Sequence, residues 1–401
     1  MTITCADCGA TQVIPPLPPG GAAVCHRCGR SLARRTRTGF DLTLACAMAI
    51  CILLPSAVLM PVMDSTIRKL GFFESRLVAS VPVIYSEVWS PLAFAFLLFA
   101  FFLPAFRALL QVIALGSLRW GWRIRQAGGI FRWSEQLTGW SMTDVVAIAG
   151  VVAYFRATAP AGVEAGIGAW SYLAVAVLAL IGDRSLDRRA VWNAILPDAT
   201  SLPGGHVASC DVCEMAASSR RPGDHCPRCG HTLDRDVAPR IATVLAAVAV
   251  AIPLCVPAFT AAIIVNDNLT GVWQHTFLGT VRLLADRGHW QYGVVVLVAG
   301  VVIPALELIG LIWMLAKVRF PSTRGLVTRT RVYRVLQRLA RWPMIVLFIA
   351  AIAAPVVDVR GIRELVAGPG AAPLFLVIAL LMLAMALFKP RLMWETAGEV
   401  A

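Results

Sequence analysis

The stretch SPLAFAFLLFAFFLPAFRALLQVIA, residues 90–114, decides the fold class of this chain. It carries one charged residue, Arg107, and exceeds the about 20 apolar residues that a helix needs to cross a bilayer. Flanking side chains can extend shorter stretches to the membrane surface. On that basis seven more stretches qualify, at residues 40–62, 140–157, 167–182, 241–264, 291–316, 342–357 and 371–388. The sequence therefore predicts an α-helical polytopic membrane protein with eight transmembrane helices.

The composition excludes the other common classes of chain. Of 401 residues, 58% are hydrophobic and only 15% are charged. The mean hydropathy of +0.73 is too high for a soluble globular domain, and disordered chains are poor in apolar residues. A net charge of +13 would indicate nucleic acid binding if it lay on a soluble surface.

The distribution of the basic residues indicates membrane orientation instead of nucleic acid binding. Eight spans place both termini on one side, and 27 of the 36 Lys and Arg residues fall on that side, against seven on the other. Because Lys and Arg accumulate on the cytoplasmic side of membrane proteins, we expect both termini in the cytoplasm and no nucleic acid partner. One helical face, made of Arg331, Arg334, Arg338 and Arg341, is expected to rest on anionic lipid headgroups.

Eight cysteines form four CxxC pairs in two cassettes, CADC with CHRC and CDVC with CPRC. Two such hairpin knuckles can place four thiolates around one Zn²⁺ ion, and a glycine after three of the four pairs suits the tight turn. We predict two structural zinc ribbons at residues 1–39 and 200–238. The expected ligands are Cys5, Cys8, Cys25, Cys28, Cys210, Cys213, Cys226 and Cys229.

Catalysis is not expected. Disulfides are disfavoured on the cytoplasmic side, and a thioredoxin-like use of CxxC would need a βαβ context that is missing. The sequence has no phosphate loop, no HExxH motif and no evident Ser/His/Asp arrangement. A membrane thiol oxidoreductase that uses the CxxC pairs remains the competing enzyme hypothesis.

Landmarks recur at a nearly constant offset along the chain. Cys28 and Cys229 lie 201 residues apart, and Trp140 and Trp342 lie 202 apart. Each half is therefore predicted to be a zinc ribbon followed by a four-span module, at residues 40–199 and 239–401. Four spans return the chain to its starting side, so the repeat is parallel. Short periplasmic β segments are expected within 63–89 and 265–290, as a surface for a partner.

These features together resemble the paraquat-inducible protein A family (PqiA/LetA). They are the two ribbons, each before four spans, Trp89 closing the first external segment, Trp140-Ser-Met-Thr-Asp144 opening the third span, and Trp192 after the fourth. The resemblance covers nearly the whole chain. In the second half Trp342-Pro-Met-Ile-Val346 lacks the acidic residue, so no role of Asp144 carries over to both halves.

The resemblance implies an inner-membrane component of intermembrane lipid transport in Gram-negative bacteria. Such a protein would pass phospholipid to or from a periplasmic MCE-domain tunnel protein (PqiB- or LetB-like). A subunit that only anchors or regulates the tunnel is the alternative.

Ionisable residues inside spans are costly and usually functional. Arg107 and Glu307 occupy equivalent positions, each three residues after a proline, and they carry opposite signs. If the halves pack about a twofold axis, such positions could meet and respond to protonation. The alternative is that these side chains only reach headgroups from helix ends. The candidates for polar coupling are Arg107, Asp144, Arg156, Glu307 and Asp358.

Overall fold

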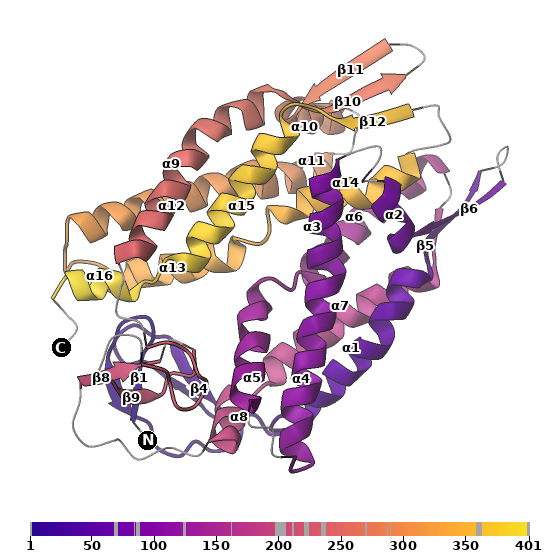
Figure 1. Cartoon of the computed structure of the whole chain (residues 1–401). Coiled ribbons are helices and arrows are strands. Elements are labelled where there is room, and N and C mark those ends of the chain that lie inside the picture. The colour runs from indigo at the N-terminus through magenta and orange to yellow at the C-terminus, as the bar shows by residue number, and fades with distance from the viewer. Residues whose placement is uncertain are drawn as a thin grey trace.

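The computed structural model is predominantly helical (Figure 1). It describes residues 2–67, 71–83, 85, 89–122, 126–161, 163–196, 206–210, 212–219, 224–233, 238–268, 271–286, 288, 290–357 and 363–398.

Within that part of the chain, seven helices are long and apolar enough to cross a membrane. The eighth predicted span forms α15 (Ala371–Leu387), which is apolar but shorter than those seven. The chain is a multi-pass membrane protein. The seven helices are Asp41–Leu59, Ser90–Arg119, Ala127–Phe155, Ile167–Ser185, Ile241–Thr260, Trp290–Arg319 and Leu326–Ile352.

The helices after the first cysteine cassette are α1 (Asp41–Leu59), α2 (Leu77–Val83), α3 (Ser90–Leu97), α4 (Leu103–Arg119), α5 (Ala127–Gln136), α6 (Thr143–Ala161), α7 (Ile167–Ser185) and α8 (Arg188–Ile195). Those after the second cassette are α9 (Ala238–Thr260), α10 (Phe277–Asp286), α11 (Trp290–Leu297), α12 (Ile303–Arg319), α13 (Leu326–Leu339), α14 (Met344–Val357), α15 and α16 (Arg391–Thr396). A 3₁₀ turn, η3 (Leu137–Gly139), links α5 to α6. The two successions of helices correspond element by element.

Equivalent helices make equivalent contacts. Helix α1 packs along α7, and α9 packs along α15. Helix α4 also packs on α1, as α12 packs on α9. Between the two groups, α6 lies against α14, so the third spans form the most extensive helix contact between the halves, to which α2 and α3 add smaller contacts with α14.

Each half contains one π-helical turn before a proline. The turns are η2 (Leu98–Phe102) and η4 (Val298–Val302), and Pro104 and Pro304 follow two residues after them. Proline has no N–H to donate, so the helical hydrogen-bond ladder must shift around it. In the first half the shift leaves the Ala100 carbonyl to accept a bond of 3.0 Å from the Tyr172 hydroxyl of α7.

Two three-stranded sheets lie at one end of the helices, the sheet end (Figure 1). One has the strand order β6-β5-β7 and the other β11-β10-β12, all antiparallel. Their bounds are β5 (Pro61–Ile67), β6 (Gly71–Arg76), β7 (Val163–Ala165), β10 (Ala262–Asn268), β11 (Gly271–Thr276) and β12 (Arg363–Ala367).

Two predicted spans end earlier than expected, because strands of the sheets begin there. The predicted helices 40–62 and 241–264 end at Leu59 and Thr260, because the next residues pair as β5 and β10. The strands β7 and β12, which complete the sheets, were not anticipated in the short second external segments.

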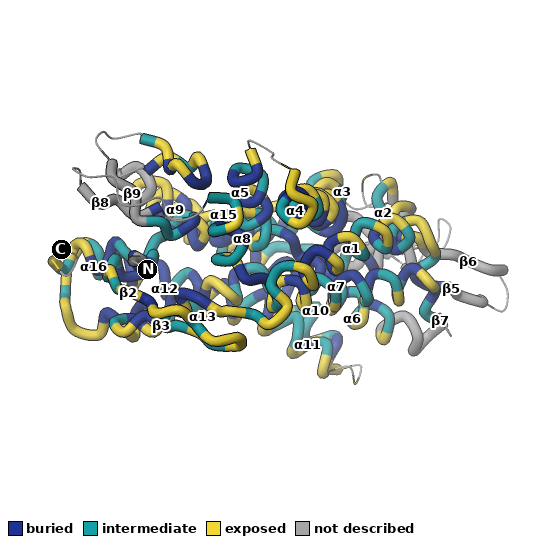
Figure 2. The backbone as a smooth tube through the Cα atoms, turned by 90° about the horizontal axis from the view of Figure 1, so that it is seen from below, coloured by how far each residue is buried: buried dark blue, intermediate teal, exposed yellow. Residues whose placement is uncertain are grey.

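The largest hydrophobic cluster joins both halves towards the sheet end. Its buried side chains come from helices of both halves, among them α1, α3, α6 and α7 of the first and α14 and α15 of the second, and Phe96 meets Phe348 with ring centroids 5.9 Å apart. Exposed residues lie on the outer faces of the helices (Figure 2). Many of these are large and apolar, as expected of helices that face lipid.

Candidate metal centres and buried charges

The four CxxC pairs form two compact clusters at the end of the helices opposite the sheets, the ribbon end. All eight cysteines are buried, and within each cluster the four sulfur atoms lie within 4.8 Å of one another. Ribbon 1 contains β1 (Thr2–Thr4), β2 (Thr11–Val13), β3 (Ala22–Val24) and β4 (Ser31–Arg34). Ribbon 2 contains β8 (His206–Ser209) and β9 (Ala216–Ser219).

The sulfur spacing suits a single metal ion in each cluster. The Sγ atoms of Cys5 and Cys28 are 3.6 Å apart, and those of Cys210 and Cys229 are 3.4 Å apart. A tetrahedron with Zn–S bonds of about 2.3 Å has edges of about 3.8 Å, whereas a disulfide is about 2.05 Å long. The clusters therefore suit metal binding, and none of the eight cysteines is in a disulfide.

Tight turns aim these sulfurs. In each knuckle the residue after the second cysteine donates its N–H to the first cysteine's carbonyl, at 2.8–3.0 Å. This turn needs a positive φ, which Gly9, Gly29 and Gly230 provide at little cost. In the fourth knuckle Glu214 holds φ at 56°, the one non-glycine residue with positive φ in the described chain. Strained backbone of this kind usually accompanies a functional contact.

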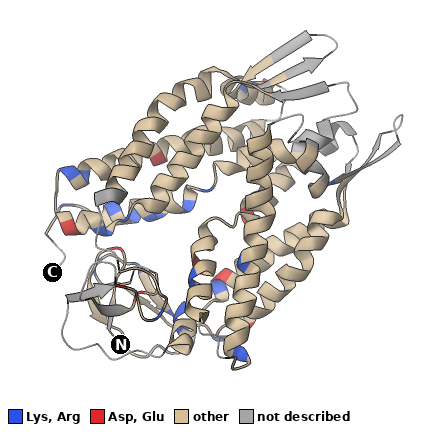
Figure 3. Cartoon of the chain, in the orientation of Figure 1, with Lys and Arg blue, Asp and Glu red and all other residues tan. Residues whose placement is uncertain are grey.

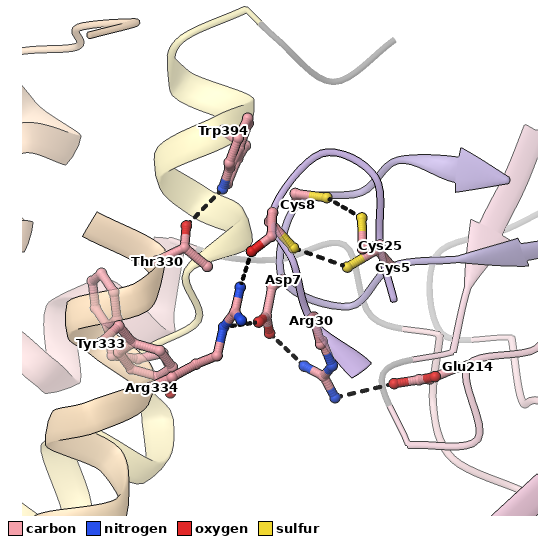
Figure 4. A network of polar contacts seen from close by, with 12 residues as sticks. Cys5, Asp7, Cys8, Cys25, Arg30, Glu214, Thr330, Tyr333, Arg334 and Trp394 are labelled. Atoms are coloured by element: carbon pink, nitrogen blue, oxygen red, sulfur yellow. Dashed lines mark hydrogen bonds and ion pairs between the residues drawn. The ribbon is translucent and has the colours of Figure 1, made fainter. Parts of the chain in front are cut away.

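Each ribbon docks on the other half of the molecule. Ribbon 1, which precedes the first helical module, packs with α9, α12, α13, α15 and α16 of the second. Arg334 of α13 donates to the Cys28 carbonyl at 2.6 Å and its Nε lies 3.0 Å from a carboxylate oxygen of Asp7. Arg27 lies over the ring of Trp394, with its guanidinium carbon 4.6 Å from the ring centroid. Figure 4 shows Arg334 beside Asp7 of ribbon 1.

Ribbon 2 docks on the first half in the equivalent manner. Arg132 of α5, 202 residues before Arg334, donates to the Cys229 carbonyl at 3.0 Å. Beside it, Arg228 donates to the Leu196 carbonyl at 2.9 Å. A Cβ atom at Gly128 would lie 2.3 Å from the Arg228 carbonyl oxygen, so the close approach of ribbon 2 to α5 requires glycine there. The main docking surface of each ribbon thus lies on the other half, although ribbon 1 also accepts a hydrogen bond of 2.9 Å at its Leu32 carbonyl from Arg189 of α8.

An ion pair joins the two ribbons to each other. Arg30 of ribbon 1 pairs with Asp7 and also with Glu214 of ribbon 2, at 3.0 Å for the second contact (Figure 4). Burial disfavours the charged form of Arg30, but Asp7 and Glu214 more than offset this and raise its pKa. Glu214 also lies 3.8 Å from Arg189 of α8. The strained Glu214 therefore links both ribbons to the first helical module.

The hypothesis that Arg107 meets Glu307 is wrong in this structure. Arg107 of α4 is buried and its guanidinium pairs with Asp183 of α7, within the same half. Position 385, which lies 202 residues after Asp183, is a methionine. Glu307 of α12 is fully buried, and neither carboxylate oxygen has a hydrogen-bond partner among the described residues.

The other predicted intramembrane residues divide into two groups. Asp144 of α6 pairs with Arg341 at 2.9 Å, which is a contact between the halves. Arg156 lies on α6, but its side chain is outside the described residues, as is the whole of Asp358. The basic face at residues 331–341 does not simply rest on headgroups, because Arg334 holds ribbon 1 and Arg341 holds Asp144.

The sequence did not predict the contacts that four residues make: Asp183, Arg132, Arg334 and Glu214. The common offset of Arg132 and Arg334 was a usable signal, since both repeat with the tryptophan landmarks. Glu214 stands where the other knuckles have glycine, which was a second signal. No sequence signal pointed to Asp183, because it lies at the end of a predicted span beside Arg184.

Acid is expected to release the metal from both clusters. Without metal, hydrogen bonds among the four thiols of each cluster separate their pKa values: they lower that of Cys28 to about 4 and that of Cys229, and they raise those of Cys8 and Cys213. A lowered pKa stabilises the folded state above the ordinary thiol pKa and loses that contribution as the pH falls through the folded value. A pH titration with a colorimetric metal indicator should show release as the pH approaches about 4. Full retention of metal well below that pH would contradict thiolate ligation.

Two buried four-cysteine clusters on a bundle of apolar helices define a class of multi-pass membrane protein with two cysteine-rich modules. The family model described as Paraquat-inducible protein A matches residues 40–195 and 241–398. The chain belongs to this family, as its sequence pattern indicated.

Curated relatives extend the match along the whole chain. It is 26% identical over 411 residues to the "Intermembrane transport protein PqiA" of Escherichia coli K12, covering 99% of this chain and 96% of that protein. It is 24% identical to a "Probable intermembrane transport protein" of Haemophilus influenzae, over 98% of this chain and 95% of that one. The "Lipophilic envelope-spanning tunnel protein A" of Escherichia coli K12 is 24% identical, over 65% of this chain and 61% of that protein. No solved structure matches.

Proposed function

We propose that this chain is the inner-membrane component of an intermembrane lipid transport system, which passes phospholipid to or from a periplasmic MCE-domain tunnel protein. The observation that carries the proposal is the match to an intermembrane transport protein over 99% of the chain. The relative named as an envelope-spanning tunnel protein supports lipophilic cargo and a tunnel partner.

In this account the chain crosses the membrane eight times and the ribbon end faces the cytoplasm. Most described Lys and Arg residues gather towards that end, as expected of a cytoplasmic face (Figure 3). The eighth crossing is α15, which pairs with α9 as α7 pairs with α1. The two sheets then lie in the periplasm, where their edge strands can receive the tunnel protein.

We also propose a parallel duplication, with ribbons at 1–39 and 200–238 and four-span modules at 40–199 and 239–401. Its support is the recurring succession of elements and the two separate blocks of the family match. The exchange of ribbons between modules makes the duplicated halves mutually dependent.

The metal is proposed to be Zn²⁺, one structural ion in each cluster, held by the eight cysteines. Four buried thiolates fill a tetrahedral site and leave no open position for chemistry. The competing oxidoreductase would need reactive dithiols, whereas these sulfurs are buried. About two tightly held Zn²⁺ ions per chain with no titratable dithiol would eliminate that enzyme hypothesis.

The buried charges are proposed to couple protonation to lipid movement. Glu307 is the strongest candidate, because a fully buried carboxylate without a described partner is costly unless it has a role. Asp144 contributes through its contact with Arg341 between the halves. Arg107, Arg156 and Asp358 remain further candidates for this coupling.

The Glu307→Gln variant is expected to fold normally and to transport phospholipid at least about tenfold more slowly, because it keeps the shape but cannot exchange a proton. The measurement is transfer of fluorescent phospholipid from proteoliposomes to the tunnel protein. Glu395→Gln makes the same chemical change at an exposed position of α16 and should transfer at the wild-type rate. Wild-type transfer by Glu307→Gln would contradict a protonation step at this residue.

A further inference from the structure

An open cavity of about 440 Å³ lies at the ribbon end of α7. One wall is formed by ribbon 1 and the segment that connects it to α1, and the other is the last turn of α7. The lining residues are Gly20, Arg34, Arg35, Thr36, Arg37, Ile181, Arg184 and Ser185.

Four arginines line this cavity, and its lining has no acidic residue. Among the described residues, no ion pair engages Arg34, Arg37 or Arg184. Arg35 donates one N–H to the Leu17 carbonyl at 2.8 Å, and its other N–H donors remain available to a ligand. The nearest acid along the chain, Asp183, is already engaged with Arg107.

Such a concentration of positive charge favours an anion with several acceptor oxygens. Arginine presents a planar fork of donors that matches phosphate or carboxylate oxygens in pairs. The four arginines are exposed, so an anion can reach them without displacing protein. A basic pocket at the end of a membrane helix is also the usual setting for recognition of an anionic headgroup.

An apolar stripe on α7 leads directly to this cavity. Trp170, Leu173, Val177 and Ile181 are all exposed and are spaced by three, four and four residues, so they share one helix face. The next position on that face, three residues on, is Arg184. A ligand on this face would contact apolar side chains along the membrane and arginines at its surface.

We propose that this cavity binds one anionic phospholipid, with its phosphate held by Arg34, Arg37 and Arg184 and an acyl chain lying along the α7 stripe. The proposal does not depend on lipid transport, because it requires only an anionic amphiphile. Position 386, which lies 202 residues after Arg184, is an alanine, so one such site per chain is expected. The bound lipid would hold ribbon 1's connecting segment against α7.

Native mass spectrometry of the full-length protein, delipidated in neutral detergent and titrated with phosphatidylglycerol, tests this proposal. The wild type should retain one phosphatidylglycerol with high affinity. The Arg34→Gln/Arg37→Gln/Arg184→Gln variant should bind it at least about tenfold more weakly, because three charge-assisted contacts are removed. The matched control is Arg319→Gln/Arg324→Gln, which removes exposed arginines at the end of α12 and in the loop after it, outside the cavity, and should bind like the wild type.

Two further arms distinguish the source of the anion. Inorganic phosphate should not compete with the bound lipid, and phosphatidylcholine should not bind tightly. Competition by phosphate would overturn the lipid assignment. Unchanged phosphatidylglycerol binding in the triple variant, or an equal loss in the control, would overturn the site itself. If the triple variant fails to fold, as judged by its metal content, the single Arg184→Glu variant carries the same expectation.

Discussion

Replacing Cys5 and Cys8 by serine is expected to expose α13 and α16 in the second half to hydrogen exchange, while α5 in the first half stays protected. The metal supplies about 10–16 kcal/mol to the folding of a small zinc module, so the ribbon unfolds without it. Arg334 and Trp394 then lose the contacts to Cys28 and Arg27 that cover them. We expect amide exchange in α13 and α16 to accelerate by about tenfold to a hundredfold.

The reciprocal variant is the control for this expectation. Replacing Cys210 and Cys213 by serine should expose α5 and α8, where Arg132 and Trp192 contact ribbon 2, and should spare α13 and α16. If each pair of substitutions instead affected the helical module that follows its own ribbon in sequence, the exchange of ribbons would be wrong.

Replacing Arg107 by methionine is expected to destabilise the protein by about 2–3 kcal/mol. The side chain is apolar and similar in length, but it leaves the Asp183 carboxylate without its partner. The full cost of breaking a buried pair is larger, and we reduce it because the Asp183 side chain is 34% exposed. Unfolding in mixed micelles with increasing denaturing detergent measures the loss.

A second substitution isolates the pair itself. In Arg107→Met/Asp183→Asn neither charge remains, so at least half of the lost stability should return. Arg119→Met on the same helix removes an exposed partner of Asp41 and should change stability by less than about 1 kcal/mol. A double variant as unstable as the sum of the two single variants would show that Arg107 and Asp183 do not interact.

The elements with strong local signals were predicted well. Helices occur at all eight predicted spans, because an apolar stretch of this length has one stable form in a bilayer. The cysteine clusters followed from CxxC spacing, which brings the four sulfurs of each cluster together through two short turns. The strands β5 and β10 were anticipated from mixed β-branched and polar residues, although their pairing with β7 and β12 was not.

Contacts between distant parts of the chain were beyond sequence reasoning. Which half a ribbon docks on depends on the length and path of a connecting segment, and no residue pattern encodes that choice. The partner of Arg107 could not be predicted for a similar reason. Equivalent positions of a repeat meet only near the symmetry axis, and α4 lies on α1 within its own half, whereas α6 and α14 form the contact between halves.

The central claim is that phospholipid passes between this chain and a periplasmic tunnel protein. The most direct test places labelled phospholipid in proteoliposomes containing the wild-type chain, adds the soluble MCE-domain protein, and measures label on the re-isolated tunnel protein. The account predicts label well above the level given by protein-free liposomes of the same lipid composition. If the chain binds the tunnel protein but label stays at that background level in both directions of transfer, the chain is an anchor and the transport function is contradicted.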